Sequence, residues 1–391
     1  MPFTLPGEIV LAEPSGKRGE GVVADLIEVL APSRHREPPP CVHFGVCGGC
    51  SLQHWRGDAY TAWKVGLIDR ALLQHGVVAP PLEATLAGLS GERRRVDFVL
   101  RRQGRRVLAG FHQRADQRVV DIGTCVVARP ALSALLAPLR TALAEILPDG
   151  AAADAVVNET DGGLDMLIRP HKRLDLSLER REALASLAER ADLARLSLGA
   201  RADAEPVVTR RTPFLSYGDV TIVPPPGVFL QATRRAETAM REAVASWLGG
   251  AKRVADLFAG IGALTAGRKG RTTLYENDAA AIAAVEAASR KLGGNRMVAV
   301  RRDLFRNPLT PSELDAFDAA VLDPPRAGAA AQVAEIARSK LTRIVYASCD
   351  PATFARDAHA LQEAGYRLEK LMPIDQFFWS VHVELIALFA K

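Results

Sequence analysis

The sequence predicts an α/β protein in which residues 226–391 form an open, mainly parallel β-sheet. Strand-like and alanine-rich helical segments alternate in this part of the chain, and most of the connections between them are short. A proline-rich joint, "TIVPPPGVFLQ" (Thr221 to Gln231), separates it from the preceding residues. Alternation of this kind indicates a sheet with helices on both faces. The strand-like segments are "RVADLFAG", "TTLYEND", "MVAVRRD", "AAVLDPP", "RIVYASC" and "VELIALF".

The composition is that of an ordinary globular protein of two or three domains. The chain has 391 residues, of which 48% are hydrophobic and 24% are charged. It contains no apolar run of the ~20 residues that a membrane span needs, and its start, "MPFTLPGEIV", lacks the sections of a signal peptide. We therefore expect a cytoplasmic protein that does not bind membranes. The net charge of +5 says little about partners.

Two further regions precede the predicted parallel sheet. In residues 1–40, "GEIVLAEPSGKRGEGVVADLIEVL" predicts two or three short strands, too few to bury a core, and "HREPPPC" predicts a linker. Residues 41–225 form a predicted central domain. Its elements are an amphipathic helix from Asp58 to His75 closed by Gly76, an antiparallel sheet from Arg94 to Val127, and helices from Pro130 to Leu147 and from Glu179 to Arg190.

An arginine-rich segment of the central domain is a candidate surface for nucleic acid. "GERRRVDFVLRRQGRR" (Gly91 to Arg106) holds seven arginines against two acids, interleaved with an apolar strand-like core. Such a pattern is expected where a surface meets phosphates. A solvated sheet face explains the segment equally well. Its first three arginines, Arg93, Arg94 and Arg95, are the candidate RNA contacts.

The first strand of the C-terminal domain ends in a glycine-containing turn. "VADLFAGIGALT" places Gly260 and Gly262 after a strand, and we expect a helix to follow them. Ligands of open α/β sheets bind beyond the carboxyl ends of the strands, where glycines allow close approach to the backbone. The third glycine of a dinucleotide-binding fingerprint is absent from this motif.

Acidic residues follow this strand and the next two. Asp256 belongs to the glycine motif, Glu276 could accept hydrogen bonds from two ribose hydroxyls, and Asp303 is placed to read an adenine edge. No lysine-bearing phosphate loop points to ATP, so S-adenosylmethionine fits better than a nucleotide. The alternative is that these acids cap helices, which is less expected for all three together.

The motif "AAVLDPPRAG" contributes Asp323 and Arg326 at the end of a further strand. Enzymes that methylate exocyclic amines carry a similar acid-Pro-Pro sequence followed by an aromatic residue. Arginine takes that place here, which disfavours an amino-group target. Its guanidinium fork suits carbonyl oxygens or phosphate.

Cys349 follows the next strand, in "IVYASCDPATFARD", and so is expected at the same edge of the sheet. A thiolate is a strong nucleophile, and a position beside a helix start is expected to favour the ionised form. A small buried side chain is the alternative role for a lone cysteine. Because Cys349 lies beyond the apolar strand and beside an Asp-Pro turn, we favour the nucleophile.

A cysteine and a methyl donor together suit methylation at carbon 5 of a pyrimidine. Addition of a thiolate to C6 makes C5 nucleophilic enough to attack a sulfonium methyl group. A base must then remove the C5 proton so that the thiolate can leave. "SVHVELIALF" offers His382 and Glu384, of which Glu384 is preferred because burial would raise its proton affinity.

These motifs jointly resemble those of the S-adenosylmethionine-dependent RNA uracil-C5 methyltransferases, in particular the bacterial 23S ribosomal RNA branch that carries an iron-sulfur cluster. The resemblance runs from about Leu5 to the end and rests on "CVHFGVCGGCSLQH", "FLQATRRAE", "DLFAGIGALT", "LDPPRAG", "YASCDPATFARD" and "HVE". It implies that Cys349 is the nucleophile and Glu384 the base. It also implies a Rossmann-like class I methyltransferase domain on which the helix of residues 58–76 packs. The implied cofactor-binding residues are Gln231, Phe258, Gly260, Glu276, Asp303 and Asp323.

The resemblance also accounts for the other four of the five cysteines, which are Cys41, Cys47, Cys50 and Cys125. An odd cysteine count in a chain without an export signal argues against a disulfide framework. Glycines at 45, 48 and 49 would let the loop wrap around inorganic sulfides. Spacing alone does not distinguish iron from zinc. The resemblance favours a [4Fe-4S] cluster with a structural role, with zinc as the alternative.

The resemblance further implies an RNA substrate, 23S ribosomal RNA before transfer RNA, and we expect a monomer. Only part of the family's N-terminal TRAM-like β-barrel is expected in residues 1–40. Thr233 and Asp350 stand where the family commonly has asparagine. Two rival functions are methylation of cytosine C5 and an inactive cluster-bearing RNA-binding or assembly protein.

Overall fold

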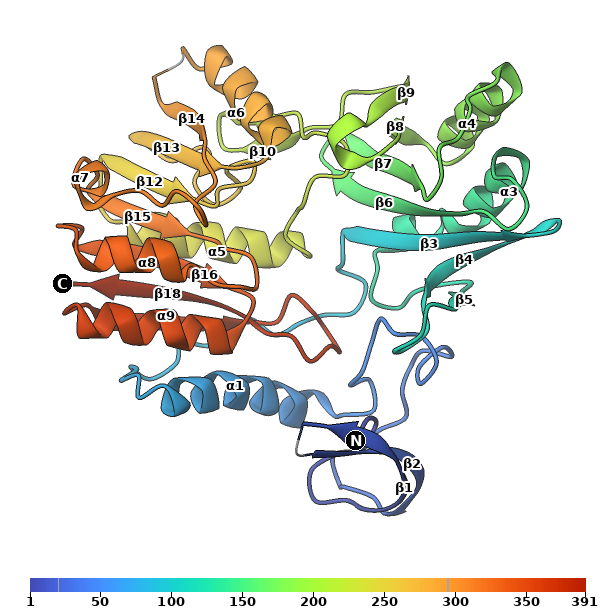
Figure 1. The fold of residues 1–391 in the computed structure, drawn as a ribbon, viewed down its shortest axis with the longest axis horizontal. Coiled ribbons are helices and arrows are strands. Elements are labelled where there is room, and N and C mark those ends of the chain that lie inside the picture. Colours follow the sequence, from blue (N-terminus) through green and yellow to red (C-terminus); the bar gives the residue numbers. More distant parts are fainter. Residues whose placement is uncertain (20, 294) are drawn as a thin grey trace.

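Two seven-stranded β-sheets lie side by side in the computed structural model, which describes residues 1–19, 21–293 and 295–391. One sheet is built from the C-terminal part of the chain and the other from the central part (Figure 1). A long helix and an N-terminal hairpin lie beneath them in the same view. The catalytic chemistry predicted from the sequence belongs to the C-terminal sheet.

The C-terminal sheet has the strand order β14-β13-β12-β15-β16-β18-β17. All neighbouring strands are parallel except those that pair with β18. This confirms the predicted open, mainly parallel sheet. The strands are β12 (Arg253–Leu257), β13 (Arg271–Glu276), β14 (Met297–Arg301), β15 (Ala319–Leu322), β16 (Arg343–Ser348), β17 (Arg367–Ile374) and β18 (Glu384–Ala390).

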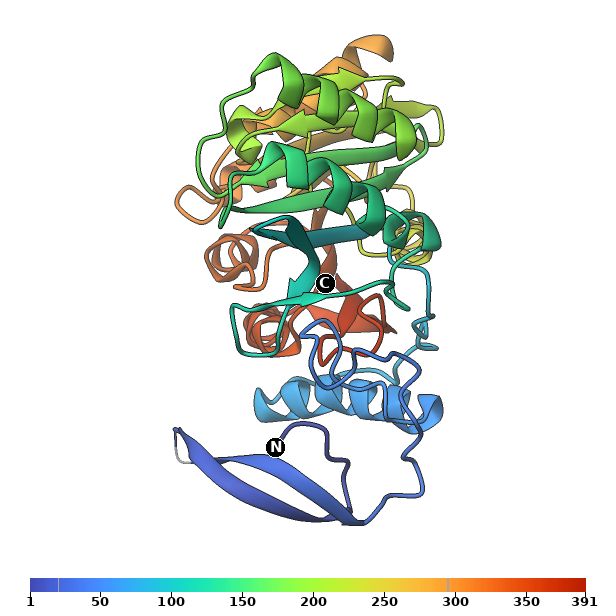
Figure 2. The same ribbon diagram turned by 90° about the vertical axis from the view of Figure 1, so that its right-hand side faces the viewer.

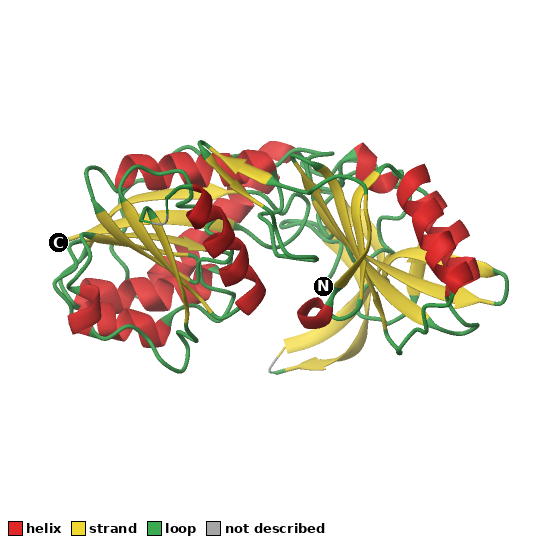
Figure 3. Cartoon of the chain, turned by 90° about the horizontal axis from the view of Figure 1, so that it is seen from above, coloured by secondary structure: helices red, strands yellow, loops and turns green. Residues whose placement is uncertain are grey.

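Helices cover both faces of this sheet (Figure 3). Strand residues that point to one side, such as Ala255 and Leu257, share a core with the helices of that side, and Val254 shares a core with a helix of the other. This two-sided burial explains why the strands are continuously apolar. The helices are α5 (Arg234–Trp247), α6 (Ala279–Lys291), α7 (Pro311–Leu314), α8 (Ala330–Ala337) and α9 (Pro351–Glu363).

Sequence reasoning missed the edge strand β17. Its sequence, "RLEKLMPI", is charged in its first half, and its burial does not alternate regularly. Within the sheet it pairs with β18, antiparallel and with a register shift between Leu368 and Lys370, and on its other side Leu86 forms an isolated parallel bridge with Ile374. An edge strand of this kind gives little hydrophobic periodicity, so its identity depends on the neighbour with which it pairs.

The prediction of a helix after Gly260 and Gly262 was wrong. This part of the chain forms turns, and it enters β13 at Arg271. Phe258, Gly260, Gly262 and Gly267 all have positive φ angles, which a right-handed helix cannot contain. At Gly267, a Cβ atom would lie 2.0 Å from the backbone oxygen of Tyr217. The chain therefore passes from β12 to β13 through a tight connection.

The central sheet has the order β5-β4-β3-β6-β7-β8-β9 and is antiparallel except where β7 pairs with β8. The first three strands in chain order, β3 to β5, are the predicted ones, and β6 to β9 were not predicted. A strand such as β8 is buried along its whole length, so its sequence lacks the alternation of apolar and polar residues by which a strand is recognised. The strands are β3 (Arg95–Gln103), β4 (Arg106–His112), β5 (Val119–Asp121), β6 (Ala152–Thr160), β7 (Gly163–Pro170), β8 (Leu193–Leu198) and β9 (Glu205–Thr209).

Two helices, α3 (Leu136–Ile146) and α4 (Leu178–Arg190), pack on this sheet and share its core. The helix predicted from Pro130 to Leu147 is divided, with a first short piece α2 (Pro130–Ser133). The 3-10 turn η1 (Arg201–Asp203) and a small hairpin of β10 (Leu215–Tyr217) and β11 (Val220–Ile222) lead toward the C-terminal sheet.

The N-terminal segment folds as one antiparallel hairpin of β1 (Ile9–Arg18) and β2 (Gly21–Ala31), which agrees with the two or three strands predicted, although its strands of 10 and 11 residues are longer than expected. Figure 2 shows that it extends away from the rest of the molecule. An isolated two-stranded hairpin is marginally stable by itself. Its base is held by Arg36, which donates to both carboxylate oxygens of Glu8 at 2.6 Å.

Helix α1 (Gly57–Gln74) lies where the sequence predicted a helix and packs against α9. Its residues Ile68 and Leu72 belong to the same core as Phe354 and Ala358 of α9. The helix thus attaches to the C-terminal sheet. Among the helices that the structure describes, none has the length and apolar character needed to cross a membrane.

Candidate active site

A cavity of about 680 Å³ opens at the carboxyl edge of the C-terminal sheet. Its walls come from the segment before α5, from the turns after β12, β13, β14 and β15, from the residue after β16 and from the first residue of β18. The structure brings together there the residues for which the resemblance implied a catalytic or cofactor-binding role, whereas Asp256, the first of the three predicted strand-end acids, is buried and does not line the cavity. The residues brought together are Gln231, Phe258, Gly260, Glu276, Asp303, Asp323, Cys349 and Glu384, and Arg326 joins them.

One end of the cavity is suited to an adenosine. The carboxylate of Glu276 accepts a 2.9 Å hydrogen bond from the backbone N–H of Gly260 and two more from the N–H groups of Asn277 and Asp278. These bonds fix the carboxylate while leaving lone pairs for ligand hydroxyls. The rings of Phe258 and Phe305 lie 5.2 Å apart and form an apolar wall.

Two acids that line the cavity, Asp323 and Glu384, and the buried Asp256, on which the charges of Asp323 and Glu276 act, give this region an unusual charge balance. Burial raises the pKa of Asp256 and of Asp323 to about 7. Burial and the nearby Asp323 raise the pKa of Glu384 to about 8. Carboxyl groups that hold protons near neutral pH would be stabilised in their ionised form by a cationic ligand. The cavity therefore fits a ligand with a positive charge.

The Cys349 thiol does not favour its ionised form, contrary to the expectation from its position before a helix. Burial and the carboxylates of Glu384 and Asp323 raise its pKa to about 11, and Arg326 only partly opposes them. The first turn of α9 is capped instead by Asp350, which accepts from the N–H of Ala352 at 3.0 Å. Nearby acids and burial therefore outweigh the helix start at this sulfur.

Similar proteins identify the family. A family model described as "tRNA (Uracil-5-)-methyltransferase" matches residues 279–391. An uncharacterized RNA methyltransferase of Brucella suis biovar 1 is 42% identical over 397 residues and covers 100% of this chain and 92% of the relative. The 23S rRNA (uracil(1939)-C(5))-methyltransferase RlmD of Aeromonas hydrophila is 32% identical over 397 residues, covering 99% and 90%. The chain belongs to the RNA uracil-C5 methyltransferases.

The fold of this RNA uracil-C5 methyltransferase is also that of a solved relative. The crystal structure of Pyrococcus abyssi tRNA (uracil-54, C5)-methyltransferase in complex with S-adenosyl-L-homocysteine matches 100% of this chain and 95% of its own, with a TM-score of 0.76 and 21% identity. The likeness confirms a Rossmann-like methyltransferase core. The enzyme uses S-adenosylmethionine, as its family does.

Of the arginines predicted to contact RNA, Arg94 is enclosed within the methyltransferase. Only 1% of its surface is exposed, and its guanidinium donates to the Glu237 carboxylate at 2.5 Å and to the backbone oxygen of Gln231. The prediction for Arg94 was therefore wrong, because an ion pair between the central segment and α5 uses this side chain. Sequence alone did not distinguish it from its neighbours in the run.

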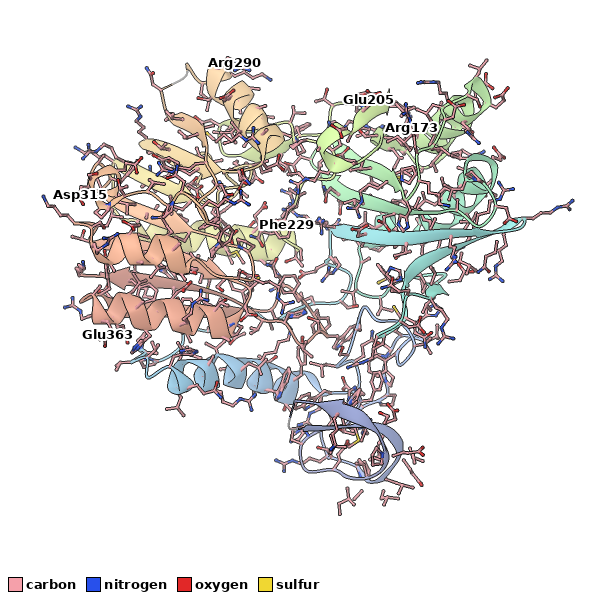
Figure 4. The ribbon with its side chains drawn as sticks, in the orientation of Figure 1. Arg173, Glu205, Phe229, Arg290, Asp315 and Glu363 are labelled. Carbon is pink, nitrogen blue, oxygen red and sulfur yellow. The ribbon has the colours of Figure 1, made fainter. Side chains whose placement is uncertain are left out.

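The neighbouring arginines lie near aromatic side chains of the active site. The guanidinium of Arg93 is 5.9 Å from the centre of the Phe377 ring, and that of Arg95 is 5.5 Å from that of Phe229. Phe229 lies at the junction of the two sheets (Figure 4). Arg326 is exposed at the cavity mouth, 3.3 Å from Nδ1 of His382.

A second cavity, of about 250 Å³, is lined by the four cysteines outside the catalytic sheet. Cys47 accepts a hydrogen bond from the N–H of Gly49, and the Gln53 side chain bonds to Cys50. In the part of the chain that the structure describes, no group of three or more His, Cys, Asp or Glu side chains is arranged to hold a metal ion. Arg93, Arg95 and Phe378 complete its wall.

Sequence reasoning missed Gln376 and Phe377, both of which reach the active site. They lie in "IDQFFWS", between β17 and β18. Phe377 lines the cavity, and Gln376 donates to the Glu384 carboxylate at 2.8 Å. The only signal was their closeness in sequence to His382 and Glu384. Phe229, Phe305 and Arg201, which also line the cavity, were missed too.

Proposed function

We propose that this enzyme methylates C5 of a uridine in 23S ribosomal RNA through a covalent bond between Cys349 and C6 of the base. One observation carries the proposal: Cys349, Glu384 and the acids that follow the parallel strands all line one cavity. A thiol, a base with raised proton affinity and a site suited to a cationic ligand are the parts that this chemistry requires.

S-adenosylmethionine supplies the methyl group on a positively charged sulfur. In our proposal, Glu276 binds the ribose hydroxyls, Asp303 the adenine edge, and Gln231 with Asp323 the part near the sulfonium. Phe258 and Gly260 complete this half of the cavity. The acids that line the cavity support the assignment, because a cationic ligand offsets the free energy of ionising Asp323 and Glu384 inside the protein.

The chemical steps follow from the two catalytic side chains. Cys349 loses its proton to solvent and its sulfur adds to C6, which makes C5 nucleophilic. After C5 has taken the methyl group, Glu384 removes the C5 proton. The electrons of that C–H bond form the C5–C6 double bond, and the C6–S bond breaks to return the thiolate. Arg326 is placed to stabilise the thiolate, since its charge lowers the pKa of Cys349.

The target uridine must leave its stack to reach Cys349, at a cost of a few kcal/mol unless it already lies in a loop. Phe229 and Phe377 offer aromatic surfaces beside Arg95 and Arg93. These two arginines, with Arg326, are the proposed phosphate or base contacts. The RlmD relative is named for 23S ribosomal RNA and the solved relative for transfer RNA. We favour ribosomal RNA because RlmD is the more similar in sequence.

We further propose that the cysteine-lined cavity holds a [4Fe-4S] cluster through Cys41, Cys47, Cys50 and Cys125. Thiolates that bind one zinc ion must converge to about 2.3 Å from it. A cluster is larger, so its four ligands surround a volume, which agrees with thiols spread around a cavity of about 250 Å³. The Gly49 N–H that points at Cys47 is the kind of donor that cluster sulfurs use.

The domain division that we propose is residues 1–40, 41–225 and 226–391, with α1 attached to the last. The β1–β2 hairpin is then the remnant of a TRAM-like barrel. We propose a cytoplasmic enzyme that acts as a monomer.

The decisive experiment uses transcripts of 23S ribosomal RNA and of transfer RNA with labelled S-adenosylmethionine. Cys349→Ala should abolish 5-methyluridine formation while RNA binding persists; surviving methylation would refute the nucleophile. Glu384→Gln should trap a covalent protein–RNA adduct, seen as a slowed band on a denaturing gel. Nucleoside mass spectrometry separates uridine from cytosine methylation. An inactive assembly protein would yield neither product nor adduct.

A further inference from the structure

A continuous chain of hydrogen bonds joins the proposed cofactor-binding end of the cavity to the proposed base. Gln231 Nε2 donates to the Asp323 carboxylate at 2.9 Å, and Gln376 Nε2 donates to Gln231 Oε1 at 2.7 Å. The same Gln376 nitrogen donates to Glu384 Oε2 at 2.8 Å. Gln376 is only 2% exposed, so water does not compete for these bonds.

One backbone group sets the direction of this whole chain. The N–H of Ala232 lies 2.8 Å from the Gln376 side-chain oxygen, and a backbone N–H can only donate. The Gln376 nitrogen therefore faces the other way and donates both of its hydrogens, to Gln231 and to Glu384. Gln231 must then present its oxygen to Gln376 and its nitrogen to Asp323.

We propose that Gln376 is a positioning residue that orients the base Glu384 and the cofactor contact Gln231 at the same time. The proposal deepens the proposed function and rests on it. Because Glu384 Oε2 accepts from Gln376, its other oxygen, Oε1, has both lone pairs open and is the favoured atom to take the C5 proton. In that step the C5–H bond breaks, the proton moves to Oε1, the C5–C6 double bond forms and the Cys349 sulfur leaves.

Helix α1 binds the residue that precedes Gln376 in the chain. The preceding residue, Asp375, accepts from the Tyr60 hydroxyl at 2.7 Å and from the Lys64 ammonium at 2.5 Å. Its backbone N–H donates to Leu86 at 2.9 Å. Two separate segments, α1 and the chain at Leu86, thus hold Asp375 through three hydrogen bonds and restrain the residue that follows it.

The test replaces Gln376 with methionine, which keeps the length of the side chain and removes its hydrogen bonds. With a 23S ribosomal RNA transcript in single-turnover experiments, the Gln376→Met enzyme should lose the C5 proton roughly 10- to 100-fold more slowly, the scale of a misplaced catalytic group. The covalent adduct should then accumulate. The acid limb of the pH–rate profile should move to higher pH, because Glu384 loses a donor that lowers its pKa.

A second variant, Gln376→Glu, keeps an acceptor for the Ala232 N–H but places an acid against Glu384. It should move the acid limb further than Gln376→Met does. The matched control is Gln332→Met, which also removes a fully buried glutamine, whose side-chain bonds among the described residues go to the backbone of Leu309. The control should leave adduct level and pH profile unchanged.

The outcomes separate this inference from the proposed function. If Glu384→Gln traps an adduct but neither Gln376 variant raises the adduct level or moves the pH limb, Gln376 has a merely structural role and the inference fails. If no variant forms an adduct, and Cys349→Ala remains active, the proposed function itself fails. Loss of activity in Gln332→Met with the same pH shift would also overturn the inference.

Discussion

The two cavities of this enzyme are built in opposite ways. The catalytic cavity draws its polar side chains from the ends of neighbouring parallel strands, and these side chains bond to one another, as Gln376 does to Glu384. The cysteine cavity draws its thiols from a loop at residues 41–50 and from Cys125, which the fold brings together. In the first, the functional side chains bond directly to one another, whereas in the second the cysteines bond to neighbours such as Gln53, Gly49 and Ser133.

This difference indicates how each cavity depends on a ligand. The catalytic cavity has its geometry fixed before substrate arrives, which is what positioning of a base requires. The cysteine cavity gathers four thiols, which in our proposal are the ligands of a cluster. We therefore expect substitutions in the first to change rates and substitutions in the second to change metal content and stability.

The largest expected effect is on metal content. Purified without oxygen, the enzyme should contain about four iron atoms per chain and absorb broadly in the visible range. Cys125→Ser should lose the iron and unfold at a lower temperature, because the centre then lacks a ligand. Cys349→Ser is the control and should keep its iron. Zinc found in place of iron would overturn the cluster proposal.

A second prediction concerns the buried contact between α1 and the segment that carries Gln376. Lys64→Met leaves the Asp375 carboxylate buried without its cation, which should cost about 3–5 kcal/mol of unfolding free energy. Denaturant unfolding measures the loss. The control Arg367→Met breaks an exposed ion pair to Glu369, at 3.7 Å, and should cost less than about 1 kcal/mol. Equal costs would contradict the assigned role of the buried pair.

The smallest predicted effect is on the pH dependence of stability. The folded-state pKa of Asp323 is raised to about 7, so this group favours folding below its ordinary pKa near 4 and loses that contribution as pH rises through about 7. Asp323→Asn should therefore stabilise the free enzyme at pH 8, by roughly 1–3 kcal/mol, and have little effect at pH 4. Thermal unfolding at both pH values measures the difference.

Asp318 is the control for that measurement, because its pKa is shifted in the opposite direction from that of Asp323. Hydrogen bonds from the backbone of Arg253 and Lys252 hold the pKa of this carboxyl below its usual range. Its contribution to stability is present at neutral pH and lost as pH falls. Asp318→Asn should therefore destabilise the protein at pH 8. If Asp323→Asn instead lowered the stability at pH 8, burial would not be raising the pKa of Asp323 in the free enzyme.

Much of the fold and of the site could be predicted from local sequence. The alternation of apolar strands with helices defines a parallel sheet, and a parallel sheet brings the ends of its strands to one edge. That is why Glu276, Asp323 and Cys349, far apart in the chain, could be assigned to a common site. Glu384 was added because the chemistry needs a base and the resemblance implies one there, and the structure places it at the same edge because β18 runs antiparallel beside β16.

Tertiary structure alone decided what depends on neighbours distant in sequence. The turn after Gly262 replaces a helix because of close packing at Gly267, and the strand β17 is defined by its partner β18. Arg94 is an internal ion-pair partner because Glu237 approaches it, and the pKa of Cys349 is raised because two carboxylates face it. The direction of the Gln376 bonds is likewise set by the N–H of Ala232.

The sequence by itself determined the order of the elements, the edge of the sheet at which catalysis takes place and the residue types available there. The tertiary structure determined protonation, orientation and accessibility. The physical reason is that local periodicity and turn chemistry act over a few residues. Desolvation, charge interactions and hydrogen-bond direction depend on whichever atoms the folded chain brings within a few ångströms.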